Sequence, residues 1–335
     1  MKSPTSKRLA ALSDRLLNPL DYLLLWYVNR ISTAYYRDRS GRTTIQRIGY
    51  AMRIGARQII LERMKWVLGP DRRCAEEWAQ LWGSYTFEMG RSLVEIVMLS
   101  QQPAAKLEEL TTLKGGDHLR AALAQNRGVM LLLSHLGAMA AVPAALGSRG
   151  YDLTITGNPI PRPFFEALLR KVIGALGIKR YLLTENLPLR AAETFRRNGL
   201  FAAFFDHAGP KHNVWLPFGK AEISVSIAPA FMALRCDVPI LCVRHSRLSD
   251  DHFELEFAPP IPVSDPAMPL RERAVATTRH AIAWFARDVI TRPEQWWPWD
   301  YAAIRPCQEP VEAARPLLGR EAAAAKSPIS EGAQP

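Results

Sequence analysis

The chain has 335 residues, of which 48% are hydrophobic and 22% are charged, and its formal net charge is +11. An apolar content near one half excludes a mostly disordered chain, and the length suffices for one large domain or two ordinary ones. The four cysteines lie far apart, without the spacing of metal ligands. This usage predicts buried thiols in a reducing compartment and argues against a structural zinc site.

Most of the positive charge lies near the N-terminus. Residues 1–73 contain fifteen Lys or Arg and five Asp or Glu, a net charge of +10, interleaved with large apolar residues. This mixture fits either a segment that binds an anionic membrane surface or a packed helix with a solvated basic face. The apolar run Tyr22–Val28 has only seven residues, whereas a membrane span needs about twenty. No small-residue cleavage site follows it, so we expect membrane docking rather than a span or a cleaved signal.

The spacing of apolar residues along the sequence changes near residue 113. Residues 8–100 show the three- and four-residue apolar spacing of helices, with a break at Gly69-Pro70. Further along, short apolar runs alternate with amphipathic segments, which predicts an α/β domain with a mixed, mostly parallel central sheet flanked by helices. We expect a docking region at 1–112, the α/β domain at 113–307 and a disordered tail at 308–335. The predicted strands are 129–133, 151–156, 181–183, 200–205, 238–244 and 253–257, and the predicted helices 164–176, 189–197, 231–234 and 271–290.

Two titratable residues follow predicted strands. His135 comes directly after the apolar run 129–134, and Asp206 after the run 200–205. Functional groups of open α/β sheets gather past the carboxyl ends of the strands, where a histidine can serve as general base and acid. Taken singly, each has a plainer interpretation: the histidine as a structural residue, and the aspartate as a helix or turn cap.

Several sequence blocks, taken together in their order, resemble one known family. The chain is similar, over roughly residues 10–305, to bacterial lipid A late acyltransferases, the lauroyl and myristoyl transferases of the lysophospholipid-acyltransferase-like superfamily. The blocks are Gly128–Gly137, Gly157-Asn158-Pro159, Gly199–Gly209, Val214–Gly219, Pro239-Ile240-Leu241 and Arg292–Trp296.

The resemblance implies a glycerolipid-acyltransferase-like fold and an enzyme that moves a fatty acyl chain from an acyl carrier protein or coenzyme A thioester. The acceptor would be a lipid-linked hydroxyl of the lipid A or a related type, at the cytoplasmic face of the bacterial inner membrane. It implies a peripheral or monotopic protein whose partners are membrane lipids and the acyl donor, with no metal or organic cofactor. No recognition-helix, zinc or aromatic-strand motif supports the third possibility, nucleic-acid binding.

The family's base is the histidine of a His-x-x-x-x-Asp/Glu motif, which corresponds here to His135. The acid position is occupied by Ala140. Loss of the orienting acid in a serine-protease triad lowers turnover by about ten-thousandfold. A missing acid at position 140 would therefore be expected to reduce activity strongly. The sequence leaves three alternatives: another carboxylate replaces the missing one, the acceptor needs less assistance, or the chain is a weak or inactive lipid-binding relative. Asp206 is the best substitute by position, with Glu222 and Asp117 as poorer ones.

The remaining candidate residues concern substrate binding. Backbone amides near Gly137 or in the loop 217–219 are candidate donors to an oxyanion. The tryptophan cluster 296–299 fits either a membrane edge or the core. Asn158 would fix a loop over the site or form a plain turn. Three cations, Arg170, Lys179 and Arg180, would hold a phosphate or be solvated surface charges. The family blocks place His207, Pro217, Phe218 and Gly219 beside the acceptor.

Overall fold

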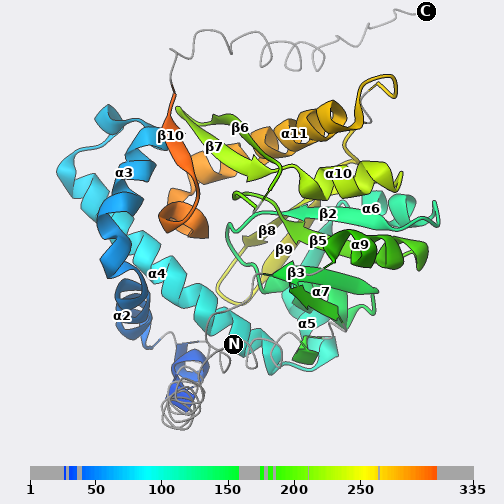
Figure 1. Cartoon of the computed structure of the whole chain (residues 1–335). Helices are drawn as coiled ribbons and strands as arrows, with labels where there is room; N and C mark the ends of the chain where they lie inside the picture. The colour runs from blue at the N-terminus through cyan, green and yellow to red at the C-terminus, as the bar shows by residue number, and fades with distance from the viewer. Residues whose placement is uncertain are drawn as a thin grey trace, which may run out of the picture.

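The computed structural model describes residues 26–27, 30–35, 40–157, 174–176, 180–183, 186–209, 211–262 and 265–307. In this part of the chain, a central sheet of seven strands is flanked by helices (Figure 1). Its strand order is β1-β9-β8-β2-β5-β3-β4. The strands are β1 (Thr111–Lys114), β2 (Val129–Leu133), β3 (Leu153–Gly157), β4 (Arg180–Leu183), β5 (Leu200–Phe204), β8 (Ile240–Arg247) and β9 (Phe253–Phe257).

The sheet is mixed and mostly parallel, as the sequence predicts. β2 pairs in parallel with β5 on one side and with β8 on the other, while β9 runs antiparallel to β8 and parallel to β1. All five residues of β2 are buried, because helices cover both faces of the sheet. The predicted strands agree with the observed ones to within three residues at each end, but β1 was not predicted.

The two faces of the sheet have separate apolar cores. Val129, Leu131 and Leu133 of β2 face one core, and Met130 and Leu132 face the other, as the two-residue period of a strand requires. The first core is covered by α5 (Ala104–Leu110), α6 (Gly116–Leu123) and α7 (Ala141–Ser148). The second is covered by α9 (Leu187–Arg196), α10 (Ala228–Arg235) and α11 (Leu270–Thr291). The predicted helix at 164–176 lies mostly outside the described residues.

A smaller sheet contributes its buried apolar residues to the second core. It consists of β10 (Ile304–Pro306), β7 (Ala221–Ser226) and β6 (Asn213–Phe218), all antiparallel, and it lies between α3 (Arg57–Leu68) and α11 (Figure 1). This sheet was not predicted from the sequence. β10 comes from a distant segment of the chain, so local sequence patterns do not reveal that it pairs with β7.

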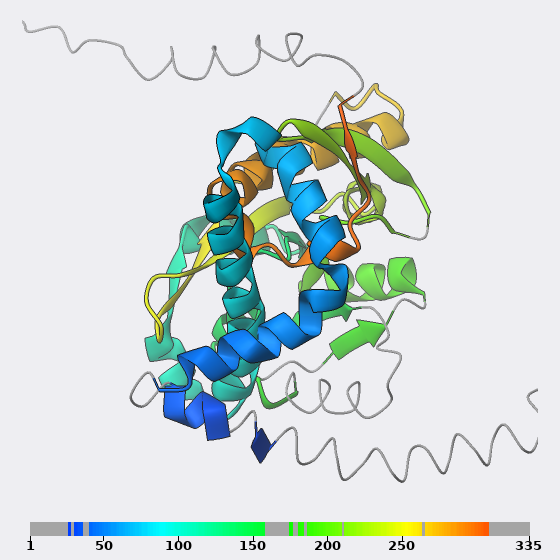
Figure 2. The same ribbon diagram turned by 90° about the vertical axis from the view of Figure 1, so that its left-hand side faces the viewer.

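The N-terminal helices form a layer beside the central sheet (Figure 2). This layer contains α2 (Arg42–Arg53), α3 (Arg57–Leu68) and the long α4 (Ala75–Ser100), with the predicted break at Gly69-Pro70 between the last two. A Cβ atom on Gly49 of α2 would lie 1.7 Å from the Thr86 carbonyl oxygen, and one on Gly90 of α4 would lie 2.0 Å from that of Ile45. Glycine at both positions therefore permits these two helices to approach closely.

Within the described residues, no helix is both long and apolar enough to cross a membrane.

Of the cysteines, Cys242 is buried, Cys236 is half-buried, and Cys74 and Cys307 are exposed. The expectation of buried thiols is therefore right for Cys242 alone. The tryptophans at 296 and 299 are fully buried, which places them in the core rather than at a membrane edge.

Candidate active site

His135 and Asp206 meet at the carboxyl edge of the central sheet. β2 and β5 are neighbours, with Leu133 opposite Phe204, so the residues that follow both strands emerge side by side. The Nδ1 atom of His135 lies 2.7 Å from Oδ1 of Asp206. The backbone N–H of His135 also donates to Oδ2 of Asp206, at 2.7 Å. One carboxylate therefore fixes both the backbone and the ring of the histidine.

The carboxylate of Asp206 is buried and has a third donor. The indole N–H of Trp296 donates to its Oδ2 at 2.8 Å. Burial alone would raise the pKa of Asp206, but the charge and hydrogen bond of His135, with a smaller effect of His207, outweigh burial and hold that pKa well below its usual range. Asp206 is therefore ionised at neutral pH and accepts the Nδ1–H of His135. That bond fixes the ring tautomer in which Nε2 can accept a proton.

Aromatic rings surround the imidazole of His135. Phe204 stacks on it with ring centroids 4.2 Å apart, and His207 lies edge-on at 5.2 Å. Tyr301 is edge-on to both imidazoles. The His135 side chain remains 19% exposed, so the ring is packed but accessible.

A cavity of about 650 Å³ opens at His135. Its walls come from β5, the end of β3, the N-terminal ends of α9 and α10, and residues 207, 209, 211 and 212. They are mainly apolar, with Phe201, Phe231 and Met232 among them. Lys211 and Arg271 are its cationic lining residues. No Asp or Glu from the described part of the chain lines the cavity. The site thus combines a histidine held by an ionised carboxylate with a mainly apolar cavity and two cationic side chains.

The backbone of the loop after β2 is held on several sides. Gly137 N–H donates to the Gln295 carbonyl, and Trp297 N–H donates to the His135 carbonyl. Gly137 has a φ of +75°, and a Cβ there would lie 2.6 Å from the His245 carbonyl oxygen, so glycine is required. Because the Gly137 amide is already engaged, it does not serve as the oxyanion donor that the sequence suggested.

The predicted substrate residues in the segment 217–219 lie elsewhere. Pro217 and Phe218 end β6, and Gly219 forms the turn of the β6–β7 hairpin against Val67 of α3. Phe218 is buried against the Trp296 ring. These three residues do not line the cavity, whereas His207 does. The amide of Lys220 in the same turn donates to the Val67 carbonyl, so this turn does not point at the site either.

The other candidate carboxylates either form an ion pair elsewhere or lie far from His135. Ala140, at the acid position of the motif, is buried at the start of α7. Glu222 forms an ion pair with Arg305 at 2.8 Å. Asp117 follows β1, which runs antiparallel to β2 and β8, so it lies toward the opposite edge of the sheet. Asp206 is the carboxylate that contacts His135.

The proposed phosphate-binding residues fall largely outside the described structure. Asn158, Arg170 and Lys179 are not among the described residues, and of Arg180 only the backbone is described, as the first residue of β4.

One group of side chains could converge on a cation. Ligand atoms of His135, Asp206 and His207 all lie within 4.8 Å of one another. Both carboxylate oxygens of Asp206 already accept hydrogen bonds, so a cation would have to displace the Nδ1–H of His135. The geometry suits acid–base chemistry without rearrangement.

Several residues of the site were not predicted from the sequence. Trp296 is the donor to Asp206, Tyr301 borders the imidazoles, and Arg271 lines the cavity from α11. Trp296 could have been found from the closing block Arg292–Trp296, because this block forms part of the family resemblance. Nothing local to the other two residues indicates their approach to His135.

The comparison with protein families agrees with this geometry. The sequence matches the family of bacterial lipid A biosynthesis acyltransferases over residues 20–299. The chain belongs to this family. A comparison with curated proteins gave no match. Membership covers the helical layer and nearly all of the α/β domain, and it supports acyl transfer as the general class of reaction.

Proposed function

We propose that this family member transfers a fatty acyl chain from a thioester donor to a lipid-linked hydroxyl, with His135 as general base and Asp206 as the acid that orients it. The observation that carries the proposal is the 2.7 Å contact between Nδ1 of His135 and the buried, ionised carboxylate of Asp206. It supplies the partner that Ala140 cannot provide. The same arrangement orients a catalytic histidine in serine-protease triads.

In the proposed reaction, Nε2 of His135 takes the proton of the acceptor hydroxyl as its oxygen attacks the thioester carbonyl. The new ester C–O bond forms, the C–S bond breaks, and the proton held by His135 passes to the departing sulfur. Asp206 keeps the ring in place and stabilises the imidazolium that exists between the two proton transfers. The donor is an acyl carrier protein or coenzyme A thioester.

The cavity supports a long acyl substrate. Its apolar walls suit an alkyl chain, since each buried methylene contributes about 0.8 kcal/mol. Lys211 and Arg271 in its lining would pair with a phosphate of the donor's pantetheine arm or of the acceptor lipid. The absence of carboxylates among the described lining residues leaves this positive charge uncompensated within the cavity wall.

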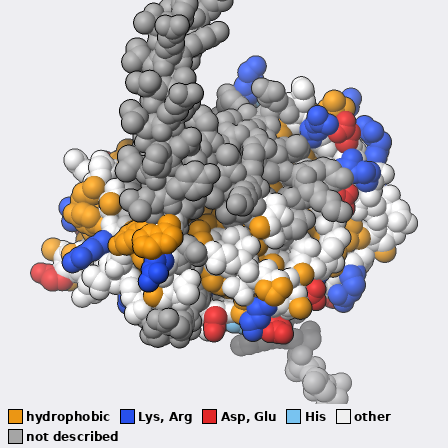
Figure 3. Space-filling model, turned by 90° about the horizontal axis from the view of Figure 1, so that it is seen from below, with side chains coloured by type: hydrophobic (Ala, Val, Ile, Leu, Met, Phe, Trp, Pro, Cys, Tyr) orange, Lys and Arg blue, Asp and Glu red, His pale blue; other side chains and the backbone are white. Residues whose placement is uncertain are grey.

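We also propose that the N-terminal helices rest on the cytoplasmic face of the bacterial inner membrane. Tyr50, Met52, Ile54 and Ile59 of the segment α2–α3 are exposed. Residues 40–61 contain four arginines and no Asp or Glu. Figure 3 shows hydrophobic and basic side chains next to one another on the lower face of the molecule. Apolar residues interspersed with arginine favour binding to anionic headgroups.

The test is transfer by the full chain, with palmitoyl-coenzyme A or palmitoyl-acyl carrier protein as donor and a panel of bacterial lipid acceptors. His135→Ala should abolish transfer, while His280→Ala, at an exposed histidine of α11, should retain it. Equal transfer by His135→Ala would exclude His135 as the base. Binding of the donor without any transfer by the unmodified chain would favour the inactive lipid-binding relative.

A further inference from the structure

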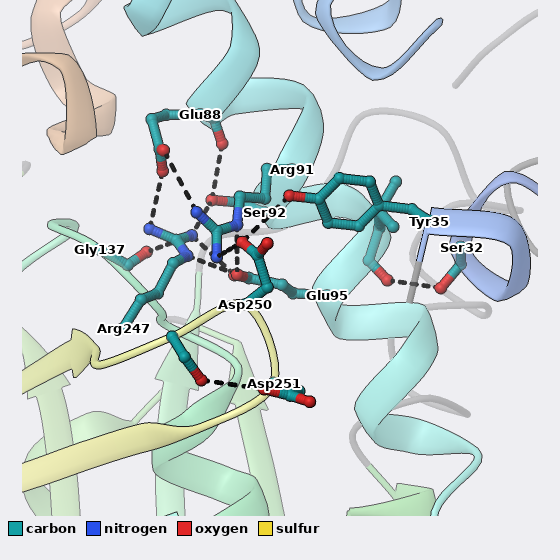
Figure 4. Close-up of polar contacts among 12 residues, drawn as sticks. Ser32, Tyr35, Glu88, Arg91, Ser92, Glu95, Gly137, Arg247, Asp250 and Asp251 are labelled. Carbon is teal, nitrogen blue, oxygen red and sulfur yellow. Dashed lines mark hydrogen bonds and ion pairs between the residues drawn. The ribbon is translucent and has the colours of Figure 1, made fainter. Parts of the chain in front are cut away.

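Arg247, the last residue of β8, reaches the loop that carries His135 (Figure 4). Its Nη2 donates to the Gly137 carbonyl, two residues after His135, at 3.2 Å. The same strand holds the loop at two further points: the His245 side chain contacts the Ser134 carbonyl through Nε2 at 3.0 Å, and the His245 carbonyl accepts from the Ala138 N–H. The end of β8 therefore supports both sides of His135.

The guanidinium of Arg247 is anchored on the opposite side by α4. Nε and Nη2 donate to the two carboxylate oxygens of Glu95, Nη1 donates to Glu88 at 2.9 Å, and Nη2 donates to the Ser92 hydroxyl at 2.9 Å. The Arg247 side chain is only 4% exposed and that of Glu95 only 1%. A buried cation between two carboxylates has little freedom to turn, because any rotation would leave charges unpaired.

The same carboxylates hold a second arginine that does not contact the loop. Arg91 pairs with Glu88 and Glu95 on its own helix and with Asp250 of the β8–β9 turn at 2.7 Å. The Tyr35 hydroxyl donates to Asp250 at 3.1 Å, so the network extends to the helical residues 30–35 that precede α2 (Figure 4). Arg91 and Arg247 thus share their anions, but of these two arginines only Arg247 has a recorded contact with the loop 134–138 in the described structure.

We propose that Arg247 is a positioning residue for the reaction: it fixes the loop 134–138 against α4 and thereby keeps Nδ1 of His135 in line with Asp206. The inference rests on the proposed function of His135 and adds the residue that holds its loop. The guanidinium suits this role because its planar donors can engage Glu95 in bidentate fashion and still reach a carbonyl. A lysine ammonium lacks this planar pair of donors and cannot bind a carboxylate in the same bidentate way.

The main experiment compares Arg247→Met, Arg247→Lys and the matched variant Arg91→Met. We expect both Arg247 variants to lower kcat by about tenfold to a hundredfold with KM little changed, since small misplacement of a catalytic group has effects of this size. Arg91→Met removes ion pairs with the same glutamates, so it should lower the melting temperature but retain kcat within about threefold. Arg247→Lys keeps the buried charge and so provides the test if Arg247→Met does not fold.

A second measurement does not depend on turnover. The Nδ1–H of His135, bonded to an ionised carboxylate, should give a strongly downfield proton resonance that His135→Ala removes. We expect Arg91→Met to retain this resonance and the folded Arg247 variants to shift or broaden it. An unchanged resonance and kcat in the Arg247 variants would overturn the inference, as would equal losses in Arg91→Met. If His135→Ala keeps full activity, the proposed base is wrong, whereas loss in His135→Ala with full activity in the Arg247 variants rejects the positioning role alone.

Discussion

His135 and Asp206 lie 71 positions apart in the sequence, yet their Nδ1 and Oδ1 atoms are 2.7 Å apart. The motif of the family would place the acid five residues after the histidine, where this chain has Ala140. Here the contacting carboxylate comes from the end of the neighbouring strand β5. The pairing of β2 with β5 thus supplies the contact that the local motif lacks.

Asp206→Asn should lower kcat by about ten-thousandfold, the size of the corresponding loss in a serine-protease triad. The amide keeps the shape of the carboxylate but removes the charge that orients His135 and stabilises its protonated form. Single-turnover acyl transfer measures the effect, with circular dichroism to verify folding. A folded Asp206→Asn variant with less than a tenfold loss would contradict the role of Asp206.

Trp296→Phe should lower both stability and activity. It removes the indole N–H that donates to Oδ2 of Asp206, and a hydrogen bond to a charged group contributes about 1.5–3 kcal/mol. We expect a fall in kcat of about tenfold. Trp299→Phe is the matched control: Trp299 is equally buried but donates to the Pro293 carbonyl, so it should lose stability in urea denaturation with little change in kcat. Equal kcat losses in both variants would point to packing instead.

His245 should make the protein less stable in acid. Burial lowers the pKa of His245 to about 4, whereas an unfolded histidine titrates near 6.5. Above pH 6.5 the residue is neutral in both states. As the pH falls from about 6.5 to about 4, the unfolded state takes up the proton first, and the free energy of unfolding should drop by roughly 3 kcal/mol. His245→Gln should flatten this part of the profile of urea denaturation against pH, and an equally steep profile would exclude His245 as the cause.

Removing the positive charge of the cavity should weaken binding of phosphate-bearing substrates. We expect Lys211→Gln with Arg271→Gln to raise the Kd for palmitoyl-coenzyme A about tenfold and to reduce its salt dependence. Binding of S-palmitoyl-pantetheine, which carries no phosphate, should change little. Arg279→Gln, an exposed position on α11, serves as the control. If only a phosphorylated lipid acceptor binds more weakly, the cations serve the acceptor rather than the donor.

Exposed apolar residues of the helical layer should contribute to membrane binding. Replacing Tyr50, Ile54 and Ile59 by serine should reduce sedimentation with vesicles of anionic phospholipid by at least tenfold, because the apolar area available for insertion is lost. Leu189→Ser changes an exposed leucine of α9 and should leave vesicle binding unchanged. Full binding by the triple variant would locate the contact elsewhere.

Some features of this protein follow from local sequence patterns alone. The fully apolar run 129–133 fits a strand covered on both sides, and Gly69-Pro70 ends one helix before the next begins. The six predicted strands and the class of sheet follow from such signals. The ends of two strands also identified His135 and Asp206, because side chains at these ends project toward the same edge.

Tertiary structure decided which of these residues meet. The order of strands in the sheet places β5 beside β2, and the segment near residue 296 returns to donate an indole N–H to Asp206. Local patterns also gave no sign that Arg247 would join α4 to Gly137, or that the hairpin β6–β7 would turn Phe218 into the core. Hydrophobic periodicity shows which face of an element is buried but not which element covers it. Contacts between distant segments depend on how the whole chain packs.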